Sequence, residues 1–461
     1  MEIWQQTAQK IAKRIQRREI SAEEATKSAL GRMADVNGSI NAVVDNFDEE
    51  ALKEAQLIDS KISAGETVGS LAGVPLTVKV NVDQIGRATT NGLRLQKNLL
   101  ASKDNPVVAN LRKAGAIIIG RTNTPAFSLR WFTRNSLHGH TKNPLNPEIT
   151  PGGSSGGAAA AVAAGIGTIG HGTDIAGSIR YPAYACGVHG LRPSLGRVPA
   201  YNFSGSDRFI GAQLTAVSGP IARSIGDLRL ALDAMSQPDI RDPWYVPMPL
   251  NGNAVPKRIA ISISPDGLDV DPIIKTELLR VASKIKAAGW QVEEVELPPL
   301  RQAMENQLFL WMAEMKHGVG SALSSEQDPD ALQVYDSLLN YIRKSSLNDV
   351  MDVLQTRSAL TREWRVFLET YPVVLCPVSG QLPFEDLLDL RSQTEFNQMI
   401  DAQMLQIGLP FMGLPCLSVT TGKVKTGPVG VQLISSHFRE DLLLDIGEII
   451  GERIEPVSPK F

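Results

Sequence analysis

Residues 149–173 form a run of 25 residues that contains no Asp, Glu, Lys or Arg. A run of this length could cross a bilayer as a helix. This one consists mostly of Gly, Ala, Ser and Thr, however, and it lacks the Leu and Phe of a lipid-facing helix. Twelve of the chain's 39 glycines lie within residues 151–200. The run therefore predicts a buried interior segment of small residues and argues against a membrane span.

The remaining composition is that of an ordinary globular chain. Its 461 residues carry 46 Lys and Arg against 49 Asp and Glu, a net charge of −3 that gives no electrostatic signature for nucleic acid. Cys186, Cys376 and Cys416 are far apart and odd in number, which excludes a disulfide framework and is typical of a reducing compartment. No CxxC or HExxH motif and no apolar N-terminal leader is present. We therefore expect a cytoplasmic protein without a metal site or a nucleic-acid partner.

Helical and extended patterns alternate along most of the chain. Residues 1–65 have helical patterns, and Ser21 and Glu24 form a capping box that opens a second helix. Helices are also expected at 107–114, 157–164, 271–288, 302–322 and 349–370, and strands at 73–80, 116–120, 166–169, 257–262, 292–297 and 372–376. This alternation predicts an α/β fold with a sheet between layers of helices. Residues 237–256, rich in Pro and Asn, form either a linker or a long surface loop.

Two glycine motifs match known fingerprints in unsuitable contexts. Gly165–Gly170 reads GxGxxG, but it follows an alanine-rich helix and leads into extended residues, the reverse of a dinucleotide-binding motif. Gly152–Gly156 reads GxSxG, the nucleophile elbow of α/β-hydrolases, which needs an acid and a histidine downstream. His437 is a candidate for that histidine, but no spacing marks it. Both motifs remain weaker alternatives to the cluster described next.

Three segments concentrate hydroxyl groups, glycines and one lysine flanked by apolar residues. They are Leu76–Asn81, which contains Lys79, Pro151–Gly157 and Gly172–Arg180. Each has a plain structural alternative. The lysine could protect an edge strand, the glycine run could be a flexible turn, and the third segment could be a tight turn closed by an ion pair between Asp174 and Arg180.

Taken together, these segments allow nucleophilic catalysis by serine. A serine hydroxyl is a weak nucleophile and needs a base. No histidine flanks either serine pair closely, and a lysine can serve as the base if it is neutral. Burial without a charged partner favours neutral lysine, because desolvation penalises the ammonium form. A second serine could relay the proton between a nucleophile and a lysine that do not touch.

The three segments closely resemble the amidase signature family, which uses a Ser–cis-Ser–Lys triad. The family's spacings are matched, with 75 residues from Lys79 to Ser154 and 24 from Ser154 to Ser178. Further segments that resemble the family are 143–144, 186–193, 219–224, 413–418 and 427–434. The resemblance covers about residues 5–450 and implies one domain over residues 1–461 with a mixed central sheet. After the N-terminal helical region of residues 1–65, it implies a signature core at 66–235 and a variable region at 238–400 that forms part of the substrate pocket.

The resemblance also implies a role for each residue of the triad. Ser178 would be the nucleophile, Ser154 the bridging serine of a cis peptide bond, and Lys79 the general base. The oxyanion hole would consist of the backbone N–H groups of Ile175, Ala176, Gly177 and Ser178. The residues expected to support this loop are Ser155, Asp174 and Arg180.

The chain departs from the family at two places near the expected site. Ala176 precedes Gly177 where the family often has two glycines, and Ala126 stands where it often has an acidic residue. Residues 128–132 align with a loop that lines the acyl pocket in the family. The candidate substrate contacts in that loop are Ser128, Arg130 and Trp131, with packing and surface charge as the alternative for the last two.

We therefore predict an amidase that cleaves a carbon–nitrogen bond of a small amide, aryl amide or carbamate through an acyl-enzyme, with no metal or organic cofactor. One alternative is the glutaminase subunit of the glutamyl/aspartyl-tRNA amidotransferase, which works only with partner subunits. The altered acyl-pocket loop and Ala126 argue against it. A second alternative is a non-catalytic binding member, against which the intact triad argues. A homodimer is left open, and resemblance at the level of the fold fixes the reaction class rather than the substrate.

Overall fold

An eleven-stranded β-sheet runs through the molecule in the order β1-β3-β2-β6-β8-β7-β12-β13-β11-β9-β10. The structure is a computed structural model that describes residues 2–342 and 346–461. The strands of the sheet are β1 (Val43–Asn46), β2 (Pro75–Lys79), β3 (Ile117–Thr122), β6 (Ile169–Asp174), β7 (His189–Arg192), β8 (Val217–Ala222), β9 (Arg258–Ile261), β10 (Gln291–Glu294), β11 (Val373–Pro377), β12 (Cys416–Val424) and β13 (Gly427–Ser435). A separate hairpin consists of β4 (Arg134–Asn135) and β5 (Gly139–His140).

The sheet is mixed, as predicted. β2 runs parallel to β3 and β6, and β9 runs parallel to β10 and β11, while the other neighbouring pairs are antiparallel. Since β2 and β6 are parallel neighbours, their last residues, Lys79 and Asp174, lie at the same end of the sheet. Ligands of open α/β sheets bind beyond the carboxyl ends of such strands.

Helices cover the sheet. They are α1 (Ala8–Gln16), α2 (Ala22–Ile40), α3 (Asp48–Ser63), α4 (Pro106–Lys113), α5 (Gly156–Ala164), α6 (Arg180–Ala185), α7 (Ile210–Thr215), α8 (Ile225–Met235), α9 (Pro272–Ala287), α10 (Arg301–Gly318), α11 (Gly320–Glu326), α12 (Pro329–Tyr341), α13 (Leu347–Thr370), α14 (Gln393–Ala402), α15 (Met404–Phe411) and α16 (Glu440–Ile450). Short 3₁₀ turns are η1 (Ile3–Gln5), η2 (Arg94–Gln96), η3 (Ala126–Ser128), η4 (Pro265–Gly267) and η5 (Leu388–Leu390).

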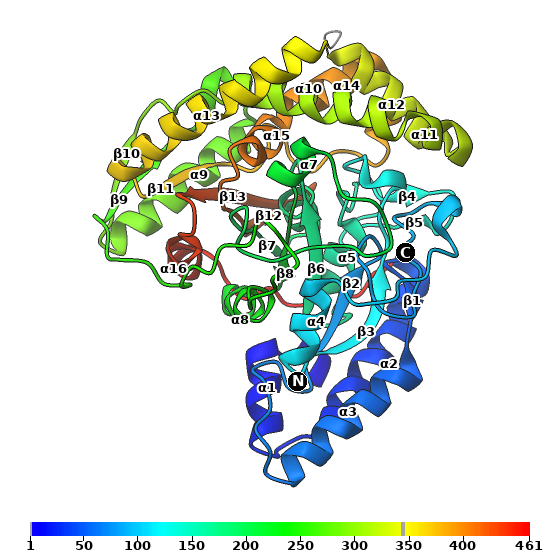
Figure 1. The fold of residues 1–461 in the computed structure, drawn as a ribbon. Coiled ribbons are helices and arrows are strands. Elements are labelled where there is room, and N and C mark those ends of the chain that lie inside the picture. The colour runs from blue at the N-terminus through cyan, green and yellow to red at the C-terminus, as the bar shows by residue number, and fades with distance from the viewer. Residues whose placement is uncertain (1, 343–345) are drawn as a thin grey trace.

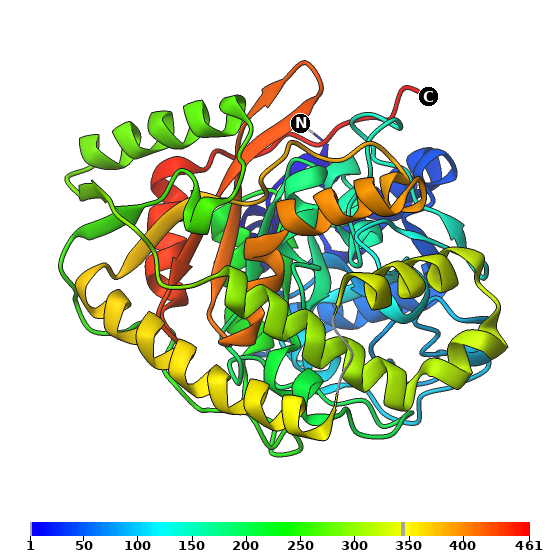
Figure 2. The same cartoon turned by 90° about the horizontal axis from the view of Figure 1, so that it is seen from above.

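The helices are arranged in distinct groups around the sheet. α5, α6, α8, α9 and α16 pack directly on the strands. Figure 1 shows α10, α12, α13 and α14 arching over one side, while α1, α2 and α3 extend at the opposite end. Seen from above in Figure 2, the orange hairpin of β12 and β13 projects past the neighbouring helices. One continuous cluster of buried apolar side chains runs from Ala8 to Ile450 and joins all these parts.

The charge-free run is packed interior, as predicted. All nine residues of α5 are buried. A Cβ on Gly157 would lie 2.5 Å from the backbone nitrogen of Asn123, and a Cβ on Gly153 would lie 2.4 Å from the carbonyl oxygen of Arg130. The glycines therefore allow close backbone contact, and the alternative of a flexible turn at 151–157 is wrong. No helix among the described residues is long and apolar enough to span a membrane.

Most predicted elements are present within a few residues, but four expectations are wrong. Residues 1–65 are not helical throughout, because β1 (Val43–Asn46) pairs with β3 at the edge of the sheet. The strand expected at 166–169 begins at Ile169 and continues to Asp174, because pairing with β8 keeps its glycines extended. The helix expected at 302–322 is divided between α10 and α11 at Val319. The alternative of an edge strand for Lys79 also fails, because β2 lies between β3 and β6.

Residues 237–256 form a surface loop rather than a linker. The backbone N–H of Val246 donates to the Gly196 carbonyl at 2.9 Å, which holds this loop against the signature core.

Candidate active site

Lys79 ends β2, and its side chain is fully buried. Its Nζ lies 2.8 Å from Oγ of Ser154, 3.1 Å from Oγ of Ser155 and 3.0 Å from Oγ1 of Thr173. Within the described residues, the hydrogen-bond partners of the amine are these three hydroxyl groups, with no carboxylate among them. The surroundings are therefore polar enough to hold an amine and contain no direct counter-charge.

This environment changes the protonation of two groups. Burial lowers the pKa of Lys79 well below its ordinary value; the negative charge of Asp174 opposes the shift and the positive charge of Arg208 adds to it. The imidazole of His171, whose Nδ1 accepts the backbone N–H of Lys79 at 3.5 Å, is also buried. Burial, with a smaller contribution from Lys79, lowers the pKa of His171 to about 3. The site therefore favours a neutral amine next to a neutral imidazole.

The second segment reaches both Lys79 and the third segment. The peptide bond between Gly153 and Ser154 is cis, as the resemblance implies. The backbone N–H of Ser155 donates to the carbonyl of Ser178 at 3.2 Å. The hydroxyl of Ser155 donates to the Thr173 carbonyl at 3.3 Å, and the Thr173 N–H donates back to Ser155 Oγ at 3.2 Å. The three segments predicted from the sequence therefore meet in one place.

Asp174 organises the loop that follows β6. Its carboxylate accepts the N–H groups of Gly177 at 2.8 Å and Ile179 at 3.2 Å. It also pairs with Arg180 at 3.0 Å and with Arg192 at 3.3 Å. Burial would raise the pKa of Asp174, but the two arginines and the Gly177 N–H hold it at about 2. The Asp174–Arg180 ion pair is present, and it holds the loop rather than closing an isolated turn.

The amides expected to form the oxyanion hole differ in their partners. The Gly177 N–H is donated to Asp174, so the expectation that it faces the substrate is wrong. Gly177 has a φ of 92°, in the region that favours glycine. Ala176 lies outside that region, so alanine in place of the family's usual glycine introduces no strain there. Among the described residues, the N–H groups of Ile175, Ala176 and Ser178 have no hydrogen-bond partner.

Two of the candidate substrate contacts, Ser128 and Arg130, lie in different surroundings. Ser128 lines the cavity at the triad, and its hydroxyl donates to Oδ1 of Asn91 at 2.7 Å. Arg130 lies in the interior, where its guanidinium donates to Asp389 at 2.7 and 2.9 Å and to Asp330 at 2.5 Å. The expectation that Arg130 contacts substrate is therefore wrong, because two carboxylates occupy its donors.

The third candidate, Trp131, is 2% exposed. Its indole Nε1–H donates to the carbonyl of Ala176 at 2.8 Å. Its ring meets that of Trp311 edge to face, with 6.4 Å between centroids, and Trp311 lines the cavity. Trp131 thus contacts both Trp311 of the cavity wall and the loop that follows β6.

Several contacts of the site were missed from the sequence. Thr173, the residue before Asp174, is a third hydroxyl partner of Lys79, and its place in the third segment could have indicated it. Asn81 ends the first segment, His171 directly precedes the third, and Arg192 lies in the segment 186–193, so these positions could also have been indicated. Arg208 and Gln307 lie where no motif marks them.

A cavity of about 910 Å³ is lined by Ser154 and Ser178. Its wall is mixed and includes five aromatic side chains, those of Phe127, Tyr201, Phe203, Trp244 and Trp311. Polar positions in the wall include Asn81, Asn202 and Arg208. The cavity is therefore suited to a flat apolar group attached to a polar reacting centre.

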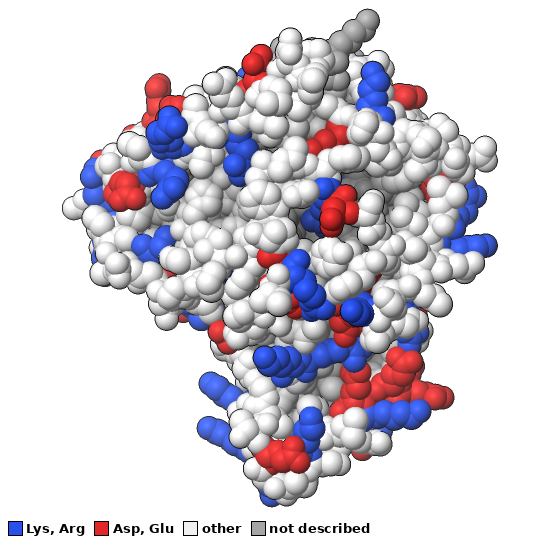
Figure 3. Space-filling model, viewed as in Figure 1, with Lys and Arg blue, Asp and Glu red and all other residues white. Residues whose placement is uncertain are grey.

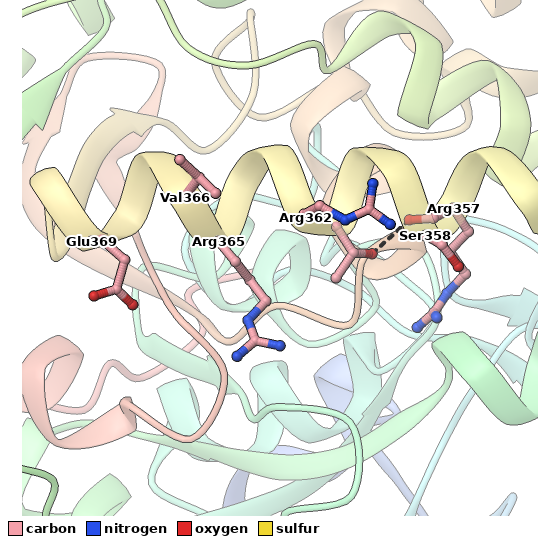
Figure 4. A pocket seen from close by; sticks show the side chains of 7 residues that line it. Arg357, Ser358, Arg362, Arg365, Val366 and Glu369 are labelled. Atoms are coloured by element: carbon pink, nitrogen blue, oxygen red, sulfur yellow. Dashed lines mark hydrogen bonds between the residues drawn. The ribbon is translucent and has the colours of Figure 1, made fainter.

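Other surfaces offer no comparable chemistry. On the face shown in Figure 3, Lys and Arg side chains are interspersed with Asp and Glu. A hollow of about 500 Å³ follows α13, where Arg357, Arg365 and Glu369 extend from the same side of the helix (Figure 4). None of the triad residues lines it. Among the described residues, no group of His, Cys, Asp and Glu could hold a metal ion.

Known proteins of similar sequence point to one family. The family model described as Amidase matches residues 24–444. An indoleacetamide hydrolase of Bradyrhizobium diazoefficiens is 41% identical over 98% of this chain and 87% of its own length. A glutamyl-tRNA(Gln) amidotransferase chain of Moorella thermoacetica is 31% identical over 96% of each chain.

Solved structures of similar fold agree with the sequence comparison. A fatty acid amide hydrolase superimposes with a TM-score of 0.86 at 26% identity, over 98% of this chain and 86% of that one. A bacterial aryl acylamidase of the amidase signature family gives a TM-score of 0.82 at 25% identity, over 98% and 95% of the two chains. The chain therefore belongs to the amidase signature family and is a hydrolase of carbon–nitrogen bonds in linear amides.

Proposed function

We propose that the protein hydrolyses a primary amide whose acyl part carries an aromatic ring, with Ser178 as nucleophile and Ser154 and Lys79 as the proton relay. The observation that carries this proposal is the 2.8 Å contact between Lys79 Nζ and Ser154 Oγ, in a site where burial lowers the pKa of the lysine. A lysine in that state can accept a proton, which serine needs to lose before it attacks.

The three hydroxyl groups around Lys79 are not equivalent. A neutral amine has two N–H donors and one lone pair. The hydroxyl of Ser155 donates to the Thr173 carbonyl, so its oxygen can accept one N–H of the amine. Thr173 Oγ1, which also accepts Asn81 Nδ2–H at 2.9 Å, can accept the other. The lone pair then faces Ser154, which makes Ser154 the hydroxyl that passes its proton to the amine.

The reaction follows from this arrangement. Ser154 gives its proton to Lys79 and takes the proton of Ser178, whose Oγ attacks the amide carbonyl. The oxyanion accepts hydrogen bonds from the N–H groups of Ile175, Ala176 and Ser178, and such donors are each worth about 2.7–4 kcal/mol in the transition state. The relay returns the proton to the nitrogen, ammonia leaves, and the acyl group remains as an ester on Ser178. Water, deprotonated by the same relay, then releases the carboxylic acid.

Two observations support an aromatic acyl group. The wall of the cavity carries five aromatic side chains, which stack or meet edge to face with flat rings. The relative from Bradyrhizobium diazoefficiens and a second one from Bradyrhizobium japonicum, 40% identical over 80% of this chain, are both named indoleacetamide hydrolases. Indole-3-acetamide joins a flat ring to a primary amide and is therefore the first substrate to test.

The test compares indole-3-acetamide, phenylacetamide, benzamide and acetamide, with ammonia and the released acid measured for each. We expect kcat/KM to be at least about tenfold higher for an aryl amide than for acetamide, because apolar contacts of this size are worth about 1–3 kcal/mol. Ser178→Ala and Lys79→Ala should each lower kcat by about 10³-fold or more. Equal rates for acetamide and the aryl amides would refute the substrate class, and full activity of either variant would refute the mechanism.

The same screen separates the two alternatives. Glutamine, tested with the isolated chain, should be a poor substrate; faster release of ammonia from glutamine than from any aryl amide would instead favour a role in an amidotransferase. A fluorophosphonate probe should label Ser178, as read by peptide mapping. Absence of an adduct on Ser178 would favour a non-catalytic binding protein.

A further inference from the structure

The loop that carries the predicted oxyanion hole is held by its carbonyl groups. In a trans peptide unit the C=O and the N–H point in opposite directions. A donor that fixes the carbonyl of one residue therefore fixes the direction of the N–H of the next residue. Four consecutive peptide units, from Asp174 to Ser178, can be followed in this way.

Every carbonyl of these four units has a donor. The Asp174 carbonyl accepts Arg192 Nη1–H at 2.6 Å, and the Ile175 carbonyl accepts Gln307 Nε2–H at 3.0 Å. The carbonyls of the next two residues accept the indole N–H of Trp131 at 2.8 Å and the backbone N–H of Tyr181 at 2.8 Å, in that order. Each of the four carbonyls is thus fixed by a donor, which fixes the opposite direction for the N–H of its own unit.

The N–H groups of these four units differ in whether they have a hydrogen-bond partner. The N–H of Gly177 is bonded to Asp174 Oδ1 at 2.8 Å, so the unit between Ala176 and Gly177 is held at both ends. Within the described part of the chain, the N–H groups of Ile175, Ala176 and Ser178 have no hydrogen-bond partner, and Ile175 and Ser178 line the cavity. The unit between Ile175 and Ala176 has one hydrogen-bond partner among the described residues, Gln307 at its carbonyl.

We propose that Gln307 is a positioning residue that orients the Ala176 N–H toward the substrate oxyanion, while Trp131 holds the following unit through the Ala176 carbonyl, with its Gly177 N–H bound to Asp174. This inference rests on the proposed serine mechanism. Gln307 lies in the middle of α10, within the variable region, and is 1% exposed. Trp131 is held through its neighbour Arg130, which pairs with Asp389 of the same region. The region expected to shape the substrate pocket therefore also aligns the catalytic amides.

One detail separates this role from ordinary packing. The side-chain oxygen of Gln307, Oε1, is buried without a hydrogen-bond partner among the described residues. An unpaired buried oxygen is unfavourable for folding, so a residue selected for stability alone would be apolar here. The amide nitrogen that bonds the Ile175 carbonyl is the feature that an apolar residue would not supply.

The test uses Gln307→Leu, which keeps an apolar body of similar size and removes the donor. Gln333→Leu is the matched control, because Gln333 also lies in the variable region and donates through Nε2 to a carbonyl, that of Leu390 at 2.7 Å. For Gln307→Leu we expect kcat to fall about 10- to 100-fold, with KM within about threefold and an unchanged or raised Tm. The acidic and basic limbs of the pH profile should stay at the same pH values, because the side-chain amide of Gln307 does not titrate. Gln333→Leu should leave kcat unchanged.

The second readout is the rate at which a fluorophosphonate labels Ser178. This reaction also needs the oxyanion hole, but it does not depend on which amide is the substrate. Labelling of the Gln307→Leu variant should be slower than that of the wild-type chain by a factor similar to its fall in kcat. Unchanged kcat and labelling in a folded Gln307→Leu variant would overturn the inference. If the wild-type chain is labelled but hydrolyses no aryl amide, the proposed substrate fails while the labelling rates still decide the role of Gln307.

Discussion

Arg130 and Asp389, 259 residues apart in the chain, form a buried ion pair with two parallel hydrogen bonds of 2.7 and 2.9 Å. The guanidinium is fully buried and the carboxylate is 2% exposed. The pair joins the loop that carries Trp131 to η5 of the variable region. Loss of Asp389 would leave Arg130 with Asp330 as its carboxylate partner, and loss of Arg130 would leave the buried charge of Asp389 without this cation.

We expect Asp389→Asn to lower the free energy of unfolding by about 3–5 kcal/mol, because it leaves Arg130 with an incomplete set of acceptors. The double variant Arg130→Met/Asp389→Leu removes both charges. Its loss of unfolding free energy should therefore be smaller than the sum of the losses in the single variants Arg130→Met and Asp389→Leu. Urea denaturation measures all of these. Additive losses would show that the pair carries no coupling.

Gly177→Ala should disable the site. Gly177 has a φ of 92°, and an added Cβ would lie 2.6 Å from Cβ of Gln406. The loop would have to move, and we expect kcat to fall about 100-fold or more, with a loss of stability of about 1–3 kcal/mol. Ala176→Gly is the matched control, because Ala176 has no left-handed backbone; its kcat should stay within about threefold. A fully active Gly177→Ala variant would refute the assigned loop geometry.

Lys79→Met should abolish activity and stabilise the fold. The pKa of Lys79 is lowered in the folded state, so below the ordinary lysine pKa of about 10.4 the unfolded chain binds a proton that the folded chain does not. That difference costs stability at pH 7 and disappears as pH rises toward 10.4. The Tm of Lys79→Met should therefore exceed that of the wild-type chain by about 1–2 °C or more at pH 7, and by less at pH 10.

The exposed Lys113→Met is the control for Lys79→Met and should change Tm little at either pH. A wild-type chain that is more stable than Lys79→Met at pH 7 would indicate that Lys79 is charged in the folded state.

Arg208→Gln should move the acidic limb of the kcat/KM profile to higher pH. Arg208 lines the cavity, and its positive charge contributes to the lowered pKa of Lys79. Without it the lysine holds its proton to a higher pH, so the neutral base is available over a narrower range. Arg241→Gln is the control, because Arg241 lines the same cavity but pairs with Asp239. A limb that stays in place in Arg208→Gln would show that the charge of Arg208 does not reach the relay.

Buried histidines should make the fold acid-labile. Burial lowers the pKa of His171 to about 3 and of His189 and His437 to about 4, while an unfolded histidine titrates near 6.5. Between about pH 6.5 and 4 the unfolded chain binds these protons and the folded chain does not. The free energy of unfolding should therefore decrease as the pH is lowered through that window, by up to about 1.4 kcal/mol per pH unit for each histidine.

A thermal scan at pH 7.5, 6.5, 5.5 and 4.5 measures this loss. His189→Gln should make stability less dependent on pH, because glutamine does not titrate. Glutamine can still donate to the Glu452 carbonyl that His189 contacts at 2.9 Å, so the hydrogen bond is kept. His317 is exposed, and His317→Gln should have no effect on the slope. Equal slopes in the three chains would contradict the assignment.

The three segments that meet around Lys79 could be found from the sequence because their composition is distinctive, and the contact between Lys79 and Ser154 agrees with the family resemblance that assigns the triad roles. Burial of the charge-free run in the protein interior could also be predicted, because the run lacks the long apolar side chains that would face lipid. The local context of Lys79 was misleading, however. A lysine between valines fits an edge strand, and only the strand order, with β2 between β3 and β6, shows that it is interior.

The rest of the site depends on contacts that no local pattern reveals. Arg130 looked like a substrate contact because its loop aligns with an acyl pocket, but its partners Asp330 and Asp389 lie about 200 residues or more away in the chain. Gln307 sits in the variable region among ordinary helical residues, so nothing in its neighbourhood indicates a contact with Ile175. The extension of β6 to Asp174 likewise depends on pairing with β8, which overrides the weak strand preference of glycine.

The order in which the parts of the site occur along the chain has a consequence for synthesis. Lys79, Ser154 and Ser178 have all left the ribosome before Gln307 and Gln406 are translated. A nascent chain that ends before α10 thus holds the three proposed triad residues without Gln307, which donates to the Ile175 carbonyl, and without the Gln406 carbonyl that accepts from Arg180. The enzyme would become active only late in translation, when the variable region folds back over the signature core, and truncated products would carry reactive groups in an inactive arrangement.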